Sequence, residues 1–170
     1  EAGGATFQDV ADWQNYDNFT FTPAQPGGFA QPYGILYKMI NFANIALEKL
    51  PGIPALDPTA TEEFINGRLA EVKFLRAFAY YYLVQIFGEV PLVDHTLLPD
   101  EYFLGRSSMR SIFDLMEKDL TEAYPLLPVS WDDPNIGRIT KGAAQGLLAK
   151  VLTFESSYAH YYPNDNYSLV

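Results

Sequence analysis

The sequence predicts an all-α fold of stacked helical hairpins, a tetratricopeptide-like right-handed array with long irregular loops. Four long stretches carry apolar residues at three- and four-residue steps, which is the period of an amphipathic helix. The pattern at Leu75–Ala77 returns at Leu148–Lys150, roughly two tetratricopeptide units of about 34 residues further on. Small residues that would let paired helices approach closely stand at Ala77, Ala79, Ala143, Ala144, Gly146 and Ala149. Residues 90–93 are extended but too short to anchor a sheet, so helices are left to form the core.

The first predicted helix begins near Pro32, a residue that suits a first helical turn. Before it, residues 1–32 are rich in glycine, proline and aromatic residues, and we interpret them as an irregular aromatic-rich loop region. The inward stripe of the helix comprises Tyr33, Leu36, Tyr37, Ile40, Ala43, Asn44, Leu47 and Leu50. The dipeptide Pro51-Gly52 ends it.

The second predicted helix starts around Asp57-Pro58 and runs to Phe87, where Gly88 supplies a left-handed stop. Thr59 followed by Glu62 fits a capping box, with Asp57 as the competing N-cap residue. Aromatic residues broaden the apolar stripe, so we expect this helix to pack on more than one side.

The third predicted helix begins at Ser107 or Ser108 and ends before Pro125, and the fourth follows an N-cap at Thr140. The chain becomes polar and aromatic beyond Ser156. We therefore divide it into the loop region, a helical domain over residues 33–157, and a truncated loop over residues 158–170.

Composition excludes several functional classes. The 170 residues carry 11 Lys and Arg against 21 Asp and Glu, a net charge of −10, which disfavours binding to nucleic acid or to anionic lipid. The absence of cysteine removes thiolate metal sites and a cysteine nucleophile. No apolar run is long enough to span a bilayer as a helix.

Catalytic and metal-binding patterns are weak. The two histidines, His95 and His160, are far apart in the sequence, and no Gly-x-Ser-x-Gly nucleophile elbow occurs. Acidic residues are numerous enough to pair by chance, and the Asp and Asn clusters at residues 132–135 and 164–166 lack EF-hand spacing. We expect no enzymatic activity, no metal and no cofactor.

Arg76 is the most informative charged residue. It lies among apolar neighbours in the second predicted helix, where an unpaired charge would be costly. We expect a structural ion pair that locks two helices together, with Asp119 or Glu71 as the partner.

Aromatic residues outside the helical stripes are candidates for ligand binding. Flat rings next to amide and carboxylate groups suit the apolar faces and hydroxyl edges of a neutral sugar. The alternative is that such rings pin the loops to the helices. The ligand-binding candidates are Trp13, Tyr16, Asn18 and Trp131.

Four stretches together resemble the SusD/RagB family of bacterial outer-membrane nutrient-binding lipoproteins. The signature elements are Leu36-Tyr37 through Ala43-Asn44, Glu71 through Val93 with its Phe-Leu-Arg-Ala and Phe-Gly-Glu-Val-Pro-Leu-Val segments, Arg106-Ser107-Ser108 through Leu127-Pro128, and Gly137-Arg138 through Val151. Relatives usually carry tryptophan a few residues ahead of the first tyrosine, where this chain has Pro32-Tyr33. Family members are much longer, so we expect a partial chain.

The resemblance implies a function. It implies a non-enzymatic protein that is lipid-anchored on the extracellular face of the outer membrane, where it binds oligosaccharides and partners a SusC-like TonB-dependent transporter. The lipid anchor would lie outside this chain. Two alternatives stay open, namely a tetratricopeptide-like adaptor that binds peptides and an α-helical carbohydrate-active enzyme.

Overall fold

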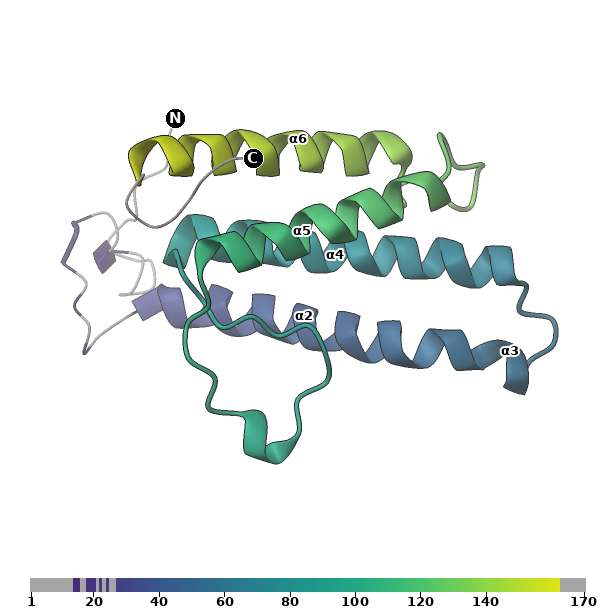
Figure 1. The fold of residues 1–170 in the computed structure, drawn as a ribbon, viewed down its shortest axis with the longest axis horizontal. Coiled ribbons are helices and arrows are strands. Elements are labelled where there is room, and N and C mark those ends of the chain that lie inside the picture. Colours follow the sequence, from purple (N-terminus) through teal and green to yellow (C-terminus); the bar gives the residue numbers. More distant parts are fainter. Residues whose placement is uncertain (1–13, 16–17, 21, 23, 25–26, 163–170) are drawn as a thin grey trace.

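The computed structural model describes residues 14–15, 18–20, 22, 24 and 27–162 of the chain, and their regular structure is dominated by helices. The long helices are α2 (Ala30–Lys49), α4 (Glu62–Phe87), α5 (Met109–Ala123) and α6 (Lys141–Tyr161). Short helical segments are η1 (Gly27–Phe29), η2 (Leu50–Gly52), α3 (Ile53–Leu56), η3 (Pro99–Glu101) and η4 (Tyr124–Leu126). The all-α prediction is confirmed (Figure 1). The tetratricopeptide-like, right-handed arrangement stays a prediction.

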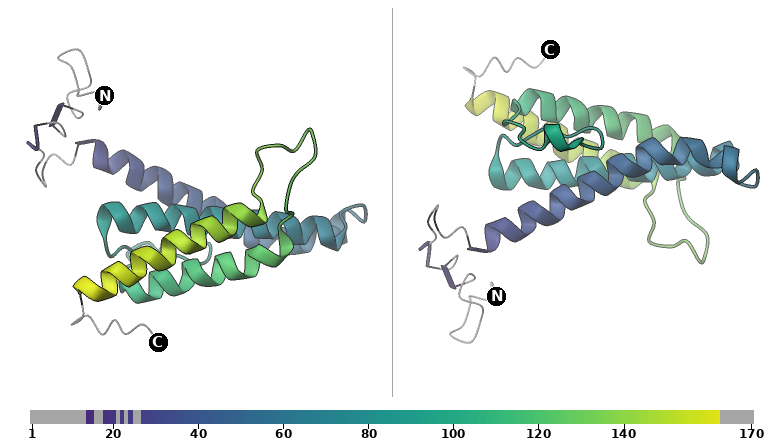
Figure 2. Two further views of the ribbon diagram at one scale, coloured as in Figure 1. Left: turned by 90° about the horizontal axis from the view of Figure 1, so that it is seen from above. Right: turned by 90° about the horizontal axis from the view of Figure 1, so that it is seen from below.

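Helix α4 is the centre of the bundle. It packs against α2 on one side and α5 on another, while α6 packs mainly on α5 and touches α4 sparsely. Figure 2 shows α2 diverging from the other three long helices. The apolar residues that α4 carries around its circumference therefore have partners on more than one side, as its sequence predicts.

The core lies where α4, α5 and α6 meet. Tyr80 and Leu83 of α4 are fully buried, as are Phe113 of α5 and Val151 of α6. Each large apolar side chain removed from water contributes about 1.5–3 kcal/mol before entropy is subtracted. The core therefore fixes the helices from which the loops project.

Side-chain caps set three of the helix starts. The hydroxyl oxygens of Thr61, Ser108 and Thr140 each accept a hydrogen bond from the backbone N–H three residues later. Helix α4 thus begins at Glu62, later than predicted. The reason is local, because the Asp57 carboxylate accepts hydrogen bonds from the N–H and hydroxyl of Thr59 and holds a turn there.

Helix α6 is longer than predicted. It continues to Tyr161, whereas the sequence pattern predicts a loop from residue 158. The ring of Tyr158 lies 6.4 Å from that of Phe113, so the helix's last turns still pack on α5. Tyr158 therefore belongs to the helix packing, whereas Tyr161 at the end of the helix is exposed.

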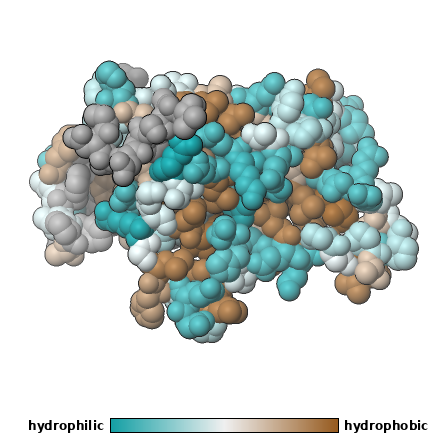
Figure 3. Space-filling model, viewed as in Figure 1, coloured by the Kyte–Doolittle hydropathy of each residue, from teal (hydrophilic) through white to brown (hydrophobic). Residues whose placement is uncertain are grey.

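Two loops project from the bundle, one between α4 and α5 and one between α5 and α6 (Figures 1 and 2). In Figure 3 the first of them, at the bottom of the view, carries hydrophobic and hydrophilic residues side by side. Among the described residues, no helix is both long and apolar enough to cross a membrane.

Candidate functional site

Trp131 lies in the loop between η4 and α6 and is half-buried. Its indole N–H donates a hydrogen bond to the carbonyl oxygen of Ile139 at 2.8 Å. At the base of the loop, the N–H of Lys141 donates to the carbonyl oxygen of Pro128 at 2.8 Å. These two bonds fold the loop on itself and fix the indole ring beside α4.

Cations and aromatic rings alternate where this loop meets α4. The guanidinium carbon of Arg68 lies 5.2 Å from the ring centre of Phe64 and 5.4 Å from that of Trp131. The guanidinium carbon of Arg138 lies 4.8 Å from the Trp131 ring. Phe64 and Arg68 are one helical turn apart, so the same face of α4 presents both.

Glu71 neutralises part of this positive charge. Its carboxylate accepts two hydrogen bonds from Arg138, at 2.6 and 2.9 Å, and pairs with Arg68 at 2.7 Å. A bidentate contact fixes the direction of a guanidinium group as well as its distance. The Trp131 loop is therefore anchored to α4 through Arg138.

A cleft of about 500 Å³ opens beside these residues. Its lining includes Phe64, Arg68, Leu126, Pro128 and Trp131. The volume and the mixture of aromatic faces with a few polar groups match small-molecule sites in general. Aromatic faces and fixed N–H donors are the groups that a sugar ring needs, so this cleft is the candidate ligand site.

Arg76 is the centre of a buried polar network. Two of its N–H groups donate to the Asp119 carboxylate at 2.7 and 2.8 Å, which joins α4 to α5. Its third nitrogen donates to the side-chain oxygen of Asn44 at 2.8 Å and to the carbonyl oxygen of Asp94 at 2.9 Å. Of the two candidate partners, the structure thus pairs Arg76 with Asp119, and Glu71 with Arg68 and Arg138.

Burial and pairing act in opposite directions on this pair. Burial by itself would lower the pKa of Arg76, but the hydrogen bonds and charge of Asp119 raise that pKa above its usual value. Burial raises the pKa of Asp119, and Arg76 opposes the rise. The guanidinium group is therefore always charged, and removing either partner would leave the other desolvated.

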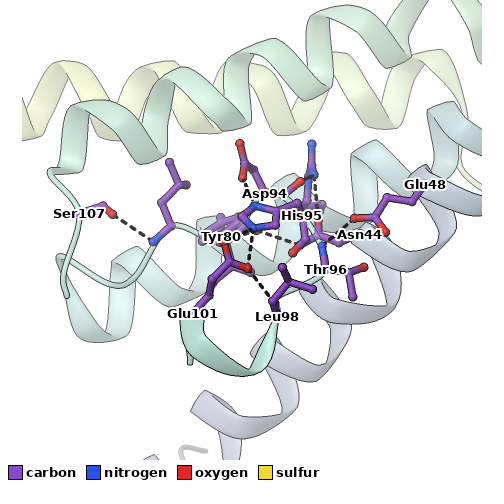
Figure 4. Close-up of polar contacts among 12 residues, drawn as sticks. Asn44, Glu48, Tyr80, Asp94, His95, Thr96, Leu98, Glu101 and Ser107 are labelled. Carbon is purple, nitrogen blue, oxygen red and sulfur yellow. Dashed lines mark hydrogen bonds and ion pairs between the residues drawn. The ribbon is translucent and has the colours of Figure 1, made fainter. Parts of the chain in front are cut away.

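The same network holds the segment that follows α4. The side-chain N–H₂ of Asn44 donates to the carbonyl oxygens of Val93 and His95, at 3.0 and 2.9 Å. The Tyr80 hydroxyl donates to the carbonyl oxygen of Val93 at 3.1 Å and accepts from its N–H at 2.7 Å (Figure 4). The backbone of this segment is therefore tied to α2 and α4.

The chain then forms a loop closed at its base, residues 92–107. The N–H of Leu92 donates to the Ser107 hydroxyl at 3.1 Å, and the N–H of Ser107 donates to the carbonyl oxygen of Val90 at 3.0 Å. Such compact closed loops are frequently functional. Within it, the His95 ring lies between two carboxylates, with Nδ1 2.9 Å from Asp94 and Nε2 3.2 Å from Glu101 (Figure 4).

The sequence of the chain matches a known family. A family profile described as SusD-like, starch-binding and associating with the outer membrane matches residues 4–152. The chain belongs to the SusD-like family. SusD-like protein P25 of Formosa agariphila is 32% identical over 124 residues, which cover 72% of this chain and 23% of that protein.

Solved structures agree with this assignment. A laminarin-binding SusD-like protein is 34% identical, with a TM-score of 0.81 over 92% of this chain and 32% of that chain. A structure solved with xylogluco-oligosaccharide is 26% identical, with a TM-score of 0.70 over 84% of this chain and 27% of that chain. The chain spans about a quarter of the length of the curated SusD-like relatives that it matches.

The two predicted ligand contacts that the structure describes, Asn18 and Trp131, lie apart on this SusD-like bundle. Trp13 and Tyr16 lie outside the described residues. Asn18 is exposed and its N–H donates to the carbonyl oxygen of Gln14 at 3.0 Å. Its segment precedes α2 at one end of the bundle, whereas the Trp131 loop lies at the other end (Figure 1). Asn18 and Trp131 therefore do not form a single site.

Sequence reasoning missed the network around the 92–107 loop. The contacts join residues about 50 positions apart, such as Asn44 and Val93, and local periodicity carries no such information. One signal is present in the sequence, because Asn44 is a polar residue within the apolar stripe of its helix. A buried polar side chain requires a hydrogen-bond partner.

Proposed function

We propose that this chain is part of a SusD-like protein that binds oligosaccharides at the cell surface and does not cleave them. The observation that carries the proposal is its likeness to a laminarin-binding SusD-like protein over almost the whole chain. The cleft at Trp131 supports it with an aromatic lining and fixed polar groups.

We extend the proposal to the partner and location that the family resemblance implies. The partner is a SusC-like TonB-dependent transporter, and the location is the extracellular face of the outer membrane, through a lipid anchor on the full-length protein. The association of the family with the outer membrane supports the location.

Binding rather than hydrolysis is favoured by the acidic residues at the Trp131 cleft, whose lining includes one carboxylate, that of Glu63. A glycosidase needs one carboxyl group held as an acid beside a second that is free to act. Glu71, which pairs with the cleft residue Arg68, is also engaged by Arg138, so it is not free to act as the second carboxylate. We expect no reducing sugar to be released when the protein is incubated with laminarin or xyloglucan.

Titration calorimetry with laminarin and xyloglucan oligosaccharides tests the cleft. Trp131→Ala should weaken binding about tenfold, because a stacked aromatic ring contributes about 0.5–1.5 kcal/mol beyond its buried area. Phe64→Ala should act similarly, and it leaves the Trp131 loop contacts in place. Val129→Ala, at an exposed site in the same loop, is the control and should change nothing.

The same titration tests whether the amino-terminal candidates contact the glycan. Trp13→Ala, Tyr16→Ala and Asn18→Ala should each weaken binding if these residues contact the glycan. Unchanged affinity in all three variants would remove them from the site. Unchanged affinity in both cleft variants would remove the Trp131 cleft.

A further inference from the structure

The 92–107 loop carries apolar side chains that the core does not use. Tyr102, at its outer end, is 63% exposed and lines a cavity, whereas the neighbouring Phe103 is 97% exposed and does not line that cavity. The loop is nevertheless fixed, because the hydrogen bonds of the Ser107 hydroxyl and N–H and the side chains of Asn44 and Tyr80 hold its base. An exposed aromatic ring on an immobilised loop is suited to binding, since little entropy remains to be lost.

A cavity of about 180 Å³ lies between this loop and the start of α2. Its lining includes Tyr33, Tyr37, Leu97, Tyr102 and Leu104. It is smaller than typical small-molecule sites of about 300–1,000 Å³, so it suits one ring of a longer ligand rather than a whole oligosaccharide.

The helix side of this cavity is rigid. The Tyr37 hydroxyl donates to the carbonyl oxygen of Pro91 at 2.7 Å, and the rings of Tyr33 and Tyr37 lie 4.7 Å apart. The Tyr33 ring also meets Phe87 edge to face at 5.1 Å. Two tyrosines with fixed rings therefore face the loop that carries Tyr102.

The loop side is held by His95. Both of its ring nitrogens face carboxylate oxygens, and only the doubly protonated ring can donate to both. The Glu101 carboxylate also accepts the N–H of Leu98 at 2.7 Å, so the ring secures the turn that precedes Tyr102. The charge of His95 therefore helps to set the conformation of the loop residues that line the cavity.

Charged groups from three neighbouring elements lie around His95. The loop itself supplies Asp94 and Glu101, and α2 supplies Glu48, which accepts the N–H of Thr96 at 2.7 Å. From α4, Arg76 reaches the carbonyl oxygen of Asp94. Two carboxylates contact the ring and a third, that of Glu48, lies near enough to interact with its charge, so the field there favours the imidazolium cation.

We propose that Tyr33, Tyr37 and Tyr102 form a second subsite, which binds one pyranose ring of a neutral glycan, and that His95 is its positioning residue. This inference rests on the proposed glycan-binding function. Three tyrosines supply ring faces and phenolic oxygens that can accept hydrogen bonds from a sugar, while the Tyr37 O–H itself is donated to Pro91. The acidic residues of the loop disfavour an anionic sugar.

The role of His95 gives this subsite a pH signature. The hydrogen bond to Asp94 raises the pKa of His95 above its ordinary value near 6.5, and the hydrogen bond to Glu101 adds a smaller rise. As the pH rises through that raised pKa, one donor is lost and a lone pair faces a carboxylate. Glycan affinity should therefore be about twofold to fivefold lower at about pH 8.5 than at about pH 5.5, the size expected for the loss of a solvent-exposed ion pair.

Titration calorimetry of the full chain with laminarin and xyloglucan oligosaccharides tests the subsite at both pH values. Tyr102→Ala should weaken binding about tenfold at either pH. His95→Gln should weaken it at about pH 5.5 and abolish the pH dependence. Phe103→Ala, the more exposed neighbour that does not line the cavity, is the matched control and should bind as the wild type does.

A second readout does not depend on sugar. In His160→Gln protein the single remaining imidazole, His95, can be titrated by NMR, and its pKa should lie above 6.5. A lower value overturns the positioning role. If Tyr102→Ala binds glycan with the affinity of the wild type, the subsite proposal is overturned but the proposed function still stands. Failure of the wild-type chain to bind either glycan contradicts both.

Discussion

The guanidinium group of Arg76, on α4, joins three other parts of the chain. It contacts Asp119 of α5, Asn44 of α2 and the carbonyl oxygen of Asp94 in the loop. The side chain is almost fully buried, and all its contacts are short. Its apolar neighbours in the sequence indicate that a partner is required. They do not indicate which carboxylate is near, because Glu71 and Asp119 are brought to their places by helix packing.

Truncating this pair should be costly. Asp119→Ala should lower the free energy of unfolding by about 3–5 kcal/mol, because it leaves a buried guanidinium group without its counter-charge. Urea denaturation followed by circular dichroism measures the change. Glu122→Gln breaks the exposed pair with Lys73 and should cost less than about 1 kcal/mol. A loss below about 1 kcal/mol for both variants would contradict the structural role of Arg76.

At the scale of elements, helix α4 depends on how it starts and stops. Its N-cap Thr61 and its final Gly88, with φ of +67°, are both visible as residue types in the sequence. The exact start was not predictable, since the competing turn at Asp57 depends on a local side-chain bond. The sequence predicts the position of the stop, but Gly88 has ψ of −131° and so lies outside the left-handed helical conformation expected of it, in a region open mainly to glycine.

Two glycine substitutions should have opposite effects. Gly88→Ala should lower the free energy of unfolding by about 1–3 kcal/mol, because an alanine is strained at this positive φ. Gly146→Ala, in the interior of α6 with open space around it, should raise stability by about 0.5–1 kcal/mol. Thermal unfolding of both variants checks this, and equal shifts of the same sign would contradict it.

The packing of α6 on α5 should respond to pH. The pKa of Glu117 is raised to about 7. Burial is the main cause, and the hydrogen bond and charge of Glu155 add to it. The folded chain therefore holds this proton more tightly than the unfolded chain, so stability falls as the pH rises from about 4.5 to about 7 and is level above it. Because Glu117 is partly exposed to solvent, we expect the loss to be about 1 kcal/mol.

Denaturation at about pH 5 and about pH 8 measures this loss, and Glu155→Gln identifies its source. The substitution removes the neighbouring negative charge, so it should shrink the difference between the two pH values. The raised pKa of His95 acts in the same direction, since its stabilising charge is lost as the pH rises, and it is untouched by the substitution. An unchanged difference in Glu155→Gln would contradict the Glu117–Glu155 coupling.

At the scale of the whole molecule, periodicity and stop signals were enough to predict four long helices and their order. The segments between them hold both candidate sites, and their contacts were beyond sequence reasoning. Trp131 was a visible candidate, but its neighbours Arg68 and Phe64 come from helix α4, more than 60 residues earlier in the sequence. The Tyr33–Tyr102 pairing likewise depends on a loop closing over α2.

The central claim is that this SusD-like chain binds glycans without cleaving them. Native gel electrophoresis in the presence and absence of laminarin or xyloglucan tests it most directly, because the shift in migration does not depend on which residues contact the glycan. We predict that the protein migrates more slowly in a gel that contains one of these neutral polysaccharides and that the polysaccharide stays intact. If the protein migrates identically in the laminarin gel, the xyloglucan gel and the gel without polysaccharide, the claim is contradicted.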